Sequence, residues 1–131
     1  MTVMDIRDRA STDVLDYQQL LSFLRDYAKP RDRIGALMAI EQTIQLAEVV
    51  ESGILVDCEA TPEMLETIFF PNNAIHDGGV ILRGNRIANA ACIFPLTQRQ
   101  DLSTSLGTRH RAAIGLTEET DAVVIVVSEE T

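Results

Sequence analysis

The chain has 131 residues, of which 46% are hydrophobic, and a net charge of −9. This length and composition predict one globular domain with a single core. The acidic balance argues against a general nucleic-acid binder and a polybasic membrane binder, and the longest stretch without Asp, Glu, Lys or Arg, 87–98, is far shorter than a membrane span of about twenty residues.

The first part of the chain predicts a polar tail followed by alternating helices and strands. Residues 1–12 are polar and charged with no apolar period, so we expect a loose tail there and a single domain over 13–131. Apolar residues at three- and four-residue steps over 14–28 predict an amphipathic helix, which Pro30 ends. The fully apolar run 34–40 has the length of a buried strand.

Three further elements are expected before residue 71. Residues 41–51 indicate a helix, and 54–56 indicate a short strand. Thr61, Pro62 and Glu63 form a good helix start, with a hydroxyl N-cap, a proline at the first helical position and an acid in the first turn. The side chains of this helix that we expect to face inward are Leu65, Ile68 and Phe69.

Residues 75–94 predict a β-hairpin. Gly84 and Asn85 suit a two-residue turn because both tolerate positive φ. The first strand begins unusually, since a histidine, an aspartate and two glycines (residues 76–79) precede a purely apolar run. Glycine weakens a strand unless something approaches the backbone closely. A carboxylate beside two such glycines therefore suggests a ligand.

After the hairpin, a polar connection leads to the last two elements. Gly107 and Thr108 suit the start of a helix that continues through 112–114, and 117–120 indicate a second turn or cap. The β-branched run 122–127 is the clearest strand. Because strands and helices alternate while the hairpin adds an antiparallel pair, we predict an α/β fold: a mixed β-sheet with helices packed on both faces.

Charge distribution and cysteine content indicate the kind of ligand and the compartment. Residues 83–111 carry five arginines and one acid, a local charge of +4 in an acidic chain. Such a segment suits a small polyanion better than a polymer, although scattered solubilising arginines give the same count. Cys58 and Cys92 lie in apolar stretches with no CxxC or histidine partner, so we expect free thiols, a cytoplasmic location and no zinc site.

Three polar clusters lie at strand ends or at a helix start, where α/β sheets usually bind ligands: residues 76–79, 108–111 and 128–130. The second cluster predicts an anion site, because N–H groups at a helix start favour phosphate and guanidinium groups add bidentate contacts. The alternative is a C-terminal cap or surface ion pairing with Glu118 and Glu119.

The first and third clusters could share a divalent cation. Mg²⁺ in phosphoryl chemistry is usually held by one or two carboxylates together with substrate oxygens. Asp77 is the best single candidate, and a His76 ligand would favour Mn²⁺ over Mg²⁺. The alternative is that His76 and Asp77 only close a turn before the strand. The chain contains no Walker A loop and no GxGxxG fingerprint, and no nucleophile arrangement stands out.

Two of these motifs together resemble those of the diadenylate cyclase (DAC) family. Asp77-Gly78-Gly79, with Gly107-Thr108-Arg109-His110-Arg111-Ala112 downstream, is similar to that family's pair of Asp-Gly-Ala and Arg-His-Arg motifs. The resemblance covers residues 33–131. It is closest to the subgroup that is normally anchored at the cytoplasmic face of the membrane.

The resemblance implies an enzyme, a nucleotidyltransferase that condenses two ATP into the second messenger cyclic di-AMP and releases two pyrophosphates. DAC domains work as a face-to-face homodimer with one ATP per subunit, and each 3′-hydroxyl attacks the α-phosphate of the other ATP. The implied cofactor is Mg²⁺ or Mn²⁺. A symmetric in-line displacement needs positioning and charge neutralisation more than a protein nucleophile, which agrees with the residues present.

The resemblance also assigns roles residue by residue. Asp77 and Glu130 would be catalytic, and the metal would be held by Asp77, His76 and Glu130. Phe94, at the end of the second hairpin strand, would lie near the adenine. The full set of implied nucleotide-binding residues is Gly78, Gly79, Phe94, Thr108, Arg109, His110, Arg111, Ser128 and Glu129.

Three departures from the family pattern define the rival hypotheses. Gly79 stands where the family has alanine, and we expect activity to persist at a reduced level. The membrane helices that usually precede this subgroup's domain are absent, so we expect no membrane contact by this chain. The family normally continues beyond Thr131 with another strand and helix, whose loss would expose a sheet edge. The rivals are an adenine-nucleotide-binding module with little or no turnover and an unrelated small α/β interaction domain.

Overall fold

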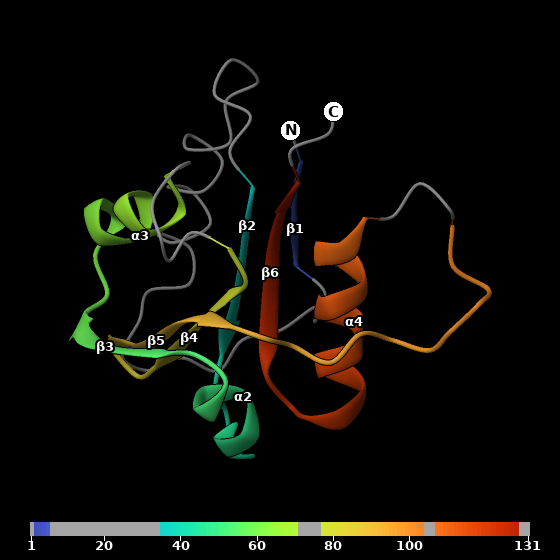
Figure 1. The fold of residues 1–131 in the computed structure, drawn as a ribbon, viewed down its shortest axis with the longest axis horizontal. Helices are drawn as coiled ribbons and strands as arrows, with labels where there is room; N and C mark the ends of the chain where they lie inside the picture. The colour runs from blue at the N-terminus through green and yellow to red at the C-terminus, as the bar shows by residue number, and fades with distance from the viewer. Residues whose placement is uncertain (1, 6–34, 71–76, 104–106, 129–131) are drawn as a thin grey trace.

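A six-stranded mixed sheet forms the centre of the molecule in the computed structural model, which describes residues 2–5, 35–70, 77–103 and 107–128 (Figure 1). The strand order is β1-β6-β2-β4-β5-β3. β2 and β4 are parallel, and the other neighbouring pairs are antiparallel, so the predicted mixed sheet is confirmed. The strands are β1 (Thr2–Asp5), β2 (Ala36–Ile40), β3 (Ile54–Glu59), β4 (Gly79–Arg83), β5 (Arg86–Cys92) and β6 (Val123–Ser128).

Helices cover both faces of the sheet, as predicted. α3 lies on one face, and α2 and α4 lie on the other (Figure 1). The alternation along β2 follows from this arrangement, because Met38 and Ile40 belong to the core beneath α3, whereas Leu37 and Ala39 belong to the core beneath α2 and α4. The described helices are α2 (Ala47–Glu51), α3 (Pro62–Phe69) and α4 (Thr108–Glu119). Within the described segments, no helix is both long and apolar enough to cross a bilayer.

The structure of β6 explains why the uninterrupted apolar run 122–127 is the clearest strand in the sequence. Its residues 123–127 are each at most 1% exposed, because both faces of the strand are covered. A strand buried on both faces has no need of polar residues at alternate positions. β-branched side chains fill such a surface well, so this strand anchors both cores.

The predicted helix start at Thr61 and the predicted hairpin are also confirmed. The Thr61 hydroxyl accepts a hydrogen bond from the backbone N–H of Met64 (3.2 Å), and the three inward-facing residues of α3 are buried. β4 and β5 pair across the turn at Gly84 and Asn85, where Gly84 alone adopts a positive φ of +58°. The glycine therefore meets the conformational demand of the turn by itself.

Several predicted boundaries differ from the structure, among them that of β3, which runs to Glu59 where the sequence predicts a strand over 54–56 only. Thr2–Asp5 form the edge strand β1, paired with β6, so those residues are not part of a loose tail. The helix expected over 41–51 begins only at Ala47. α4 continues without interruption through Glu119 instead of ending before a second turn. The amphipathic helix expected over 14–28 lies outside the described residues.

Candidate functional site

Strand directions bring the beginning of β4 and the end of β6 to one edge of the sheet. β2 and β4 start at this edge, and β6, which runs antiparallel to β2, ends there. Met38 pairs with Val80, and Ala36 pairs with Val127, so Gly78 and Val127 lie level with each other across β2, one residue before Ser128. With neighbouring strands about 4.8 Å apart, their backbones are about 10 Å apart. α4 also begins at this edge (Figure 1).

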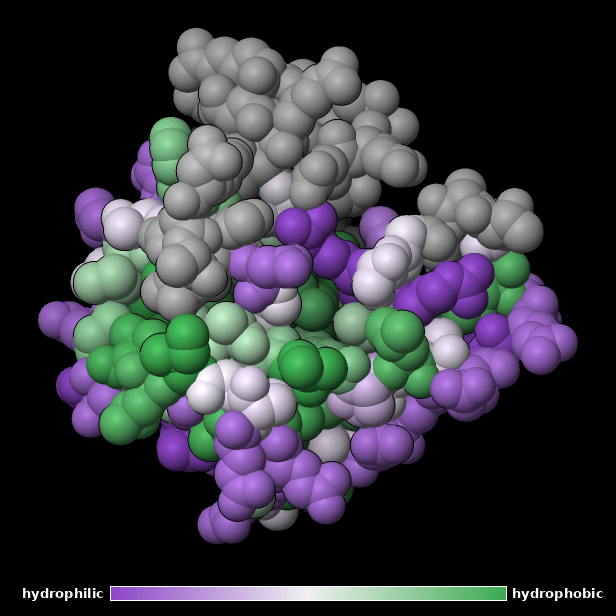
Figure 2. Space-filling model, in the orientation of Figure 1, coloured by the Kyte–Doolittle hydropathy of each residue, from purple (hydrophilic) through white to green (hydrophobic). Residues whose placement is uncertain are grey.

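A cavity of about 520 Å³ opens at this edge between the hairpin and the start of α4. That volume is in the range of sites for small organic ligands. On the face of the molecule drawn in Figure 2, hydrophobic residues gather across the middle and hydrophilic residues lie mainly around them. The residues that line the cavity come from β2, the turn before β4, the end of β5 and the first turns of α4: Leu37, Asp77, Gly78, Cys92, Ile93, Phe94, Leu96, Gly107, Thr108, Arg109, His110 and Ala112.

The turn before β4 presents the Asp77 carboxylate to solvent at the cavity wall. Asp77 is exposed, and its Oδ1 accepts a hydrogen bond from the Gly78 backbone N–H (3.0 Å). Gly78 has a φ of +83°, and a Cβ placed there would lie 2.8 Å from the Cys92 carbonyl oxygen. The backbone thus approaches β5 of the same chain at this glycine, and only glycine combines that φ with that approach.

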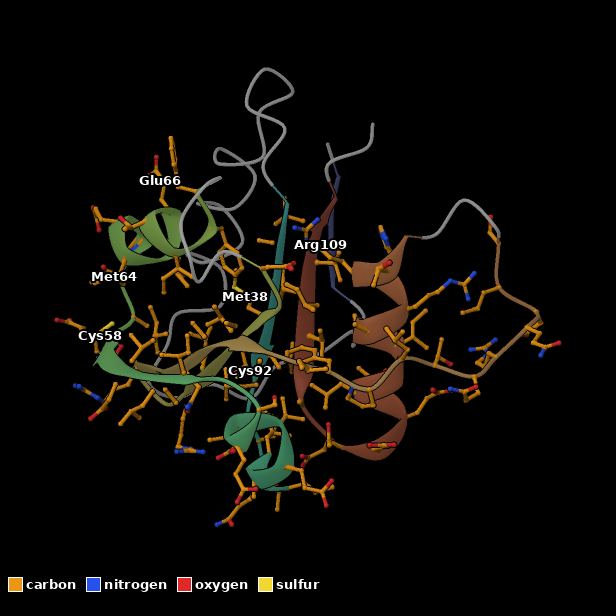
Figure 3. All side chains as sticks on the ribbon, in the orientation of Figure 1. Met38, Cys58, Met64, Glu66, Cys92 and Arg109 are labelled. Carbon is orange, nitrogen blue, oxygen red and sulfur yellow. The ribbon has the colours of Figure 1, made fainter. Side chains whose placement is uncertain are left out.

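The start of α4 supplies the basic half of the cavity. Gly107 is the N-cap and gives no side-chain hydrogen bond to the helix, and the first turn contains no acidic residue. Thr108 is exposed, Arg109 and His110 are half-buried, and Arg109 extends from the helix start toward the sheet (Figure 3). Cations at a helix N-terminus oppose the helix dipole, so this end of α4 is arranged for an anion.

His110 holds an unusual buried polar atom. Its Nδ1 is shielded from solvent and has no hydrogen-bond partner. Most buried polar atoms in folded proteins are paired. Because a buried N–H without an acceptor costs more than an unpaired lone pair on an aromatic nitrogen, we expect the neutral ring to carry its proton on Nε2.

The other arginines of the basic segment are engaged away from the cavity. Arg83 contacts Glu41 (2.9 Å), Arg86 contacts Asp57 (2.7 Å), and Arg99 contacts Asp101 (2.8 Å). Glu41 and Asp57 offset two of the four net positive charges of this segment, and Asp101 is already counted within that net charge. The basic character near the cavity therefore comes from the first turn of α4 alone among the described residues.

Ion pairs with the acidic residues at the other end of α4 do not explain the basic residues in its first turn. Glu118 and Glu119 are exposed in the last turn of the helix. Seven residues separate Arg111 from Glu118 in the sequence. At about 1.5 Å of rise per residue the separation along the axis is about 10 Å, and it is larger for Arg109. Ion pairs between these groups would need much shorter distances.

The predicted site residues fall into three groups. The cavity-lining group comprises Asp77, Gly78, Phe94, Thr108, Arg109 and His110, of which Phe94 is only 4% exposed. Gly79 is buried behind Phe94, and Arg111 is not among the lining residues. His76, Glu129 and Glu130 lie outside the described residues, and for Ser128 only the strand position is described.

Several lining residues were not predicted as site residues. Ile93 and Leu96 are 73% and 50% exposed, and large apolar side chains left in the open beside a carboxylate are the signal that could have found them. Cys92, at the end of β5 (Figure 3), is buried and lines the cavity, and burial raises the pKa of its thiol to about 11. It is therefore protonated at neutral pH and contributes apolar surface instead of a metal ligand or nucleophile.

Asp77, the one predicted metal ligand among the described residues, suits a hard divalent cation. The Asp77 carboxylate is an exposed oxygen donor on the cavity wall, which suits Mg²⁺ or Mn²⁺ when phosphate oxygens complete the coordination. The described part of the chain contains no cluster of three potential metal ligands. The other two predicted ligands, His76 and Glu130, are outside that part.

The fold and the cavity define an α/β domain with a cavity between a carboxylate and the basic start of a helix. The chain belongs to the DAC family, described as DisA bacterial checkpoint controller nucleotide-binding, which matches residues 28–131. This match confirms the resemblance found in the two motifs.

Three relatives place the chain within the family. Cyclic di-AMP synthase CdaA of Bacillus subtilis is 48% identical over 99 residues, which cover 76% of this chain and 36% of that protein. A structure described as a hypothetical membrane spanning protein from Bacillus cereus has a TM-score of 0.82 at 38% identity, and covers 92% of this chain and 57% of that chain. DacA from Staphylococcus aureus has a TM-score of 0.75 at 39% identity, over 87% of this chain and 79% of that chain.

The chain spans between 34% and 50% of the length of the curated relatives that it matches. Their names, which include diadenylate cyclase, refer to whole proteins.

Proposed function

We propose that this chain is a diadenylate cyclase domain that condenses two ATP into cyclic di-AMP and two pyrophosphates. The observation that carries the proposal is the meeting of Asp77 and the basic start of α4 on one cavity, in a chain of the DAC family. Neither half alone would distinguish a phosphate site from a turn or a helix cap. Together they provide an anion-binding surface with a carboxylate beside it.

The start of α4 is proposed to bind the triphosphate. The backbone N–H groups of its first turn, the Thr108 hydroxyl and the Arg109 guanidinium are donors on one side of the cavity. The Nε2–H group of the His110 ring adds a further donor. Arg111 and Ser128 are proposed to complete the phosphate contacts, together with Glu129 as a neighbouring polar group.

Asp77 is proposed to act at the other end of the nucleotide. Its carboxylate would accept a hydrogen bond from the 3′-hydroxyl and hold a divalent cation, with His76 and Glu130 as further ligands. The bound Mg²⁺ or Mn²⁺ would neutralise charge that develops on the transferring phosphoryl group. Gly78 keeps the carboxylate in place through its backbone N–H.

The apolar part of the cavity is proposed to receive the adenine. Ile93 and Leu96 offer exposed apolar surface, whereas Phe94 offers at most an edge because it is almost fully buried. One cavity of this size suits one nucleotide per chain. Formation of two phosphodiester bonds then requires a second copy whose cavity faces the first, which supports a homodimer as the active species.

The test is direct: the protein is incubated with ATP and either Mg²⁺ or Mn²⁺, and products are separated by chromatography. We expect cyclic di-AMP, at a rate per chain that rises with protein concentration as dimers form. Saturable ATP binding without product would refute the cyclase and support a nucleotide-binding module. Absence of ATP binding would refute both nucleotide hypotheses and leave the interaction domain.

A further inference from the structure

We propose that Phe94 is a positioning residue that holds the two halves of the site together, and that Gly79 is its necessary packing partner. The inference rests on the proposed function, because it concerns how the same cavity keeps its shape for ATP. It gives a physical reason for the one position where the Asp77-Gly78-Gly79 motif departs from the family pattern.

The first contact joins Phe94 to the carboxylate half. A Cβ added to Gly79 would lie 2.5 Å from Cζ and 2.6 Å from Cε1 of the Phe94 ring. Real Cβ atoms do not approach ring carbons that closely, so the ring occupies the space that an alanine methyl group would need. Gly79 is also the first residue of β4, two residues after Asp77. The ring therefore supports the backbone from which the carboxylate projects.

The second set of contacts joins Phe94 to the basic half. Phe94 belongs to the core cluster that includes Ala112 and Ala113 of α4. The chain after Phe94 is held against the same helix, because the Thr97 backbone N–H donates to the Arg111 carbonyl (3.1 Å). It also crosses α4 so closely that a Cβ at Gly115 would overlap the Pro95 carbonyl group. A movement of the Phe94 ring would thus displace both walls of the cavity.

An alanine methyl group at position 79 would push the Phe94 ring toward the cavity. The ring is 4% exposed, and the open space next to it is the cavity, because Phe94 is one of the residues that line it. Gly79→Ala should therefore narrow the nucleotide site. Restoring the family's motif residue is expected to weaken the protein's affinity for ATP, unless the ring is made smaller at the same time.

The experiment is a double-mutant cycle with Gly79→Ala, Phe94→Leu and the double variant. KM for ATP and kcat are measured well below the midpoint of thermal unfolding, which is measured separately without nucleotide. We expect Gly79→Ala to raise KM by about tenfold or more, since one extra methyl group in a packed site has effects of that size. Phe94→Leu alone should lower kcat by about tenfold, because the two halves lose their fixed separation. The double variant should recover KM to within about threefold of wild type, a non-additive result.

Phe69→Leu combined with Gly79→Ala is the matched control. Phe69 is as buried as Phe94 but packs in the core on the opposite face of the sheet. We expect no rescue of KM by this substitution. Additive effects in the Phe94 cycle, or variants that lower only the unfolding temperature with KM unchanged, would overturn the proposal.

The experiment distinguishes failure of the proposed cyclase function from failure of the proposed role of Phe94. If the wild-type protein bound ATP but made no cyclic di-AMP, the cyclase proposal alone would fail. The same cycle measured as the dissociation constant for ATP would then decide the role of Phe94.

Discussion

At the scale of single residues, contacts within the chain require glycine at three positions near the start of β4 and in α4. The space that side chains would need at Gly78, Gly79 and Gly115 is already filled by the Cys92 carbonyl, the Phe94 ring and the Pro95 carbonyl. The sequence suggested that the two glycines after Asp77 admit a ligand. In the structure, the atoms that approach these two glycines belong to the protein's own backbone and to the Phe94 side chain. Sequence patterns identify a glycine that is out of place in a strand, but they do not say what approaches it.

Gly115 gives the clearest stability prediction at this scale. Glycine inside a helix is normally less favourable than alanine by about 0.5–1 kcal/mol. Gly115→Ala should nevertheless lower the free energy of unfolding by about 2 kcal/mol or more, because the new methyl group would overlap the Pro95 carbonyl and separate α4 from the 95–97 segment. Denaturant unfolding measures the difference.

The matched control is Gly107→Ala, at the N-cap of the same helix, where an added Cβ meets nothing within 4 Å. It should lower the free energy of unfolding by about 0.5–1 kcal/mol, because alanine is a poorer N-cap than glycine, and therefore by less than Gly115→Ala does. If Gly115→Ala instead raised the free energy of unfolding, as glycine-to-alanine changes inside helices usually do, α4 and the segment after Phe94 would not cross this closely.

At the scale of secondary-structure elements, the segment between β2 and α2 shows how tertiary contacts override a local pattern. Residues 41–51 contain good helix formers, yet the helix begins only at Ala47. The Asp121 carboxylate accepts the backbone N–H groups of Thr43 (3.1 Å) and Ile44 (3.0 Å), and Glu41 accepts that of Leu46 (3.1 Å). Since Asp121 lies 77 residues from Ile44 in the sequence, no local analysis could assign these bonds.

The same tether predicts a dependence of stability on pH. Hydrogen bonds from the Ile44 and Thr43 backbones hold the pKa of Asp121 below its ordinary value of 3.8. A carboxylate whose pKa is lower in the folded state stabilises the protein above its unfolded-state pKa, and this stabilisation is lost as the pH falls through the folded-state pKa. Asp121→Asn should therefore lower the free energy of unfolding by about 1 kcal/mol at pH 7, and the difference from wild type should shrink below pH 4.

Thermal or denaturant unfolding at pH 7 and at pH 3 measures this effect. Glu119→Gln, which removes an exposed carboxylate from the last turn of α4, is the control and should change little at either pH. A difference between wild type and Asp121→Asn that stayed constant from pH 7 to pH 3 would mean that the charge on Asp121 plays no part in the tether.

At the scale of the whole molecule, the sequence predicted the architecture better than it predicted the site. Hydrophobic periodicity and turn residues were enough for the mixed sheet and the helices on both of its faces, because burial imposes a direct pattern on the sequence. The pairing of β1 with β6 could not be predicted, since it joins residues 2–5 to the other end of the domain. The burial of Phe94 and the ion pairs of Arg83, Arg86 and Arg99 depend on neighbours that only the fold brings near.

The motifs nevertheless identified both halves of the cavity. Asp77 and the first turn of α4 are separated in the sequence but line one space, because β4 begins at the edge of the sheet where α4 begins. The apolar contribution of Ile93 and Leu96 was missed, since exposed apolar residues after a strand carry no motif. The central claim is that these two halves act on one ATP, with separate roles.

That claim is tested most directly by comparing Asp77→Asn and Arg109→Ala in ATP binding and in cyclic di-AMP formation, with Arg99→Ala as a control. Arg99 pairs with Asp101 and is not among the lining residues, so its loss should leave both measurements unchanged. We predict that Asp77→Asn abolishes turnover while the protein still folds and binds ATP, and that Arg109→Ala weakens ATP affinity by about tenfold or more. Full turnover by Asp77→Asn, or wild-type affinity in Arg109→Ala, would contradict the account.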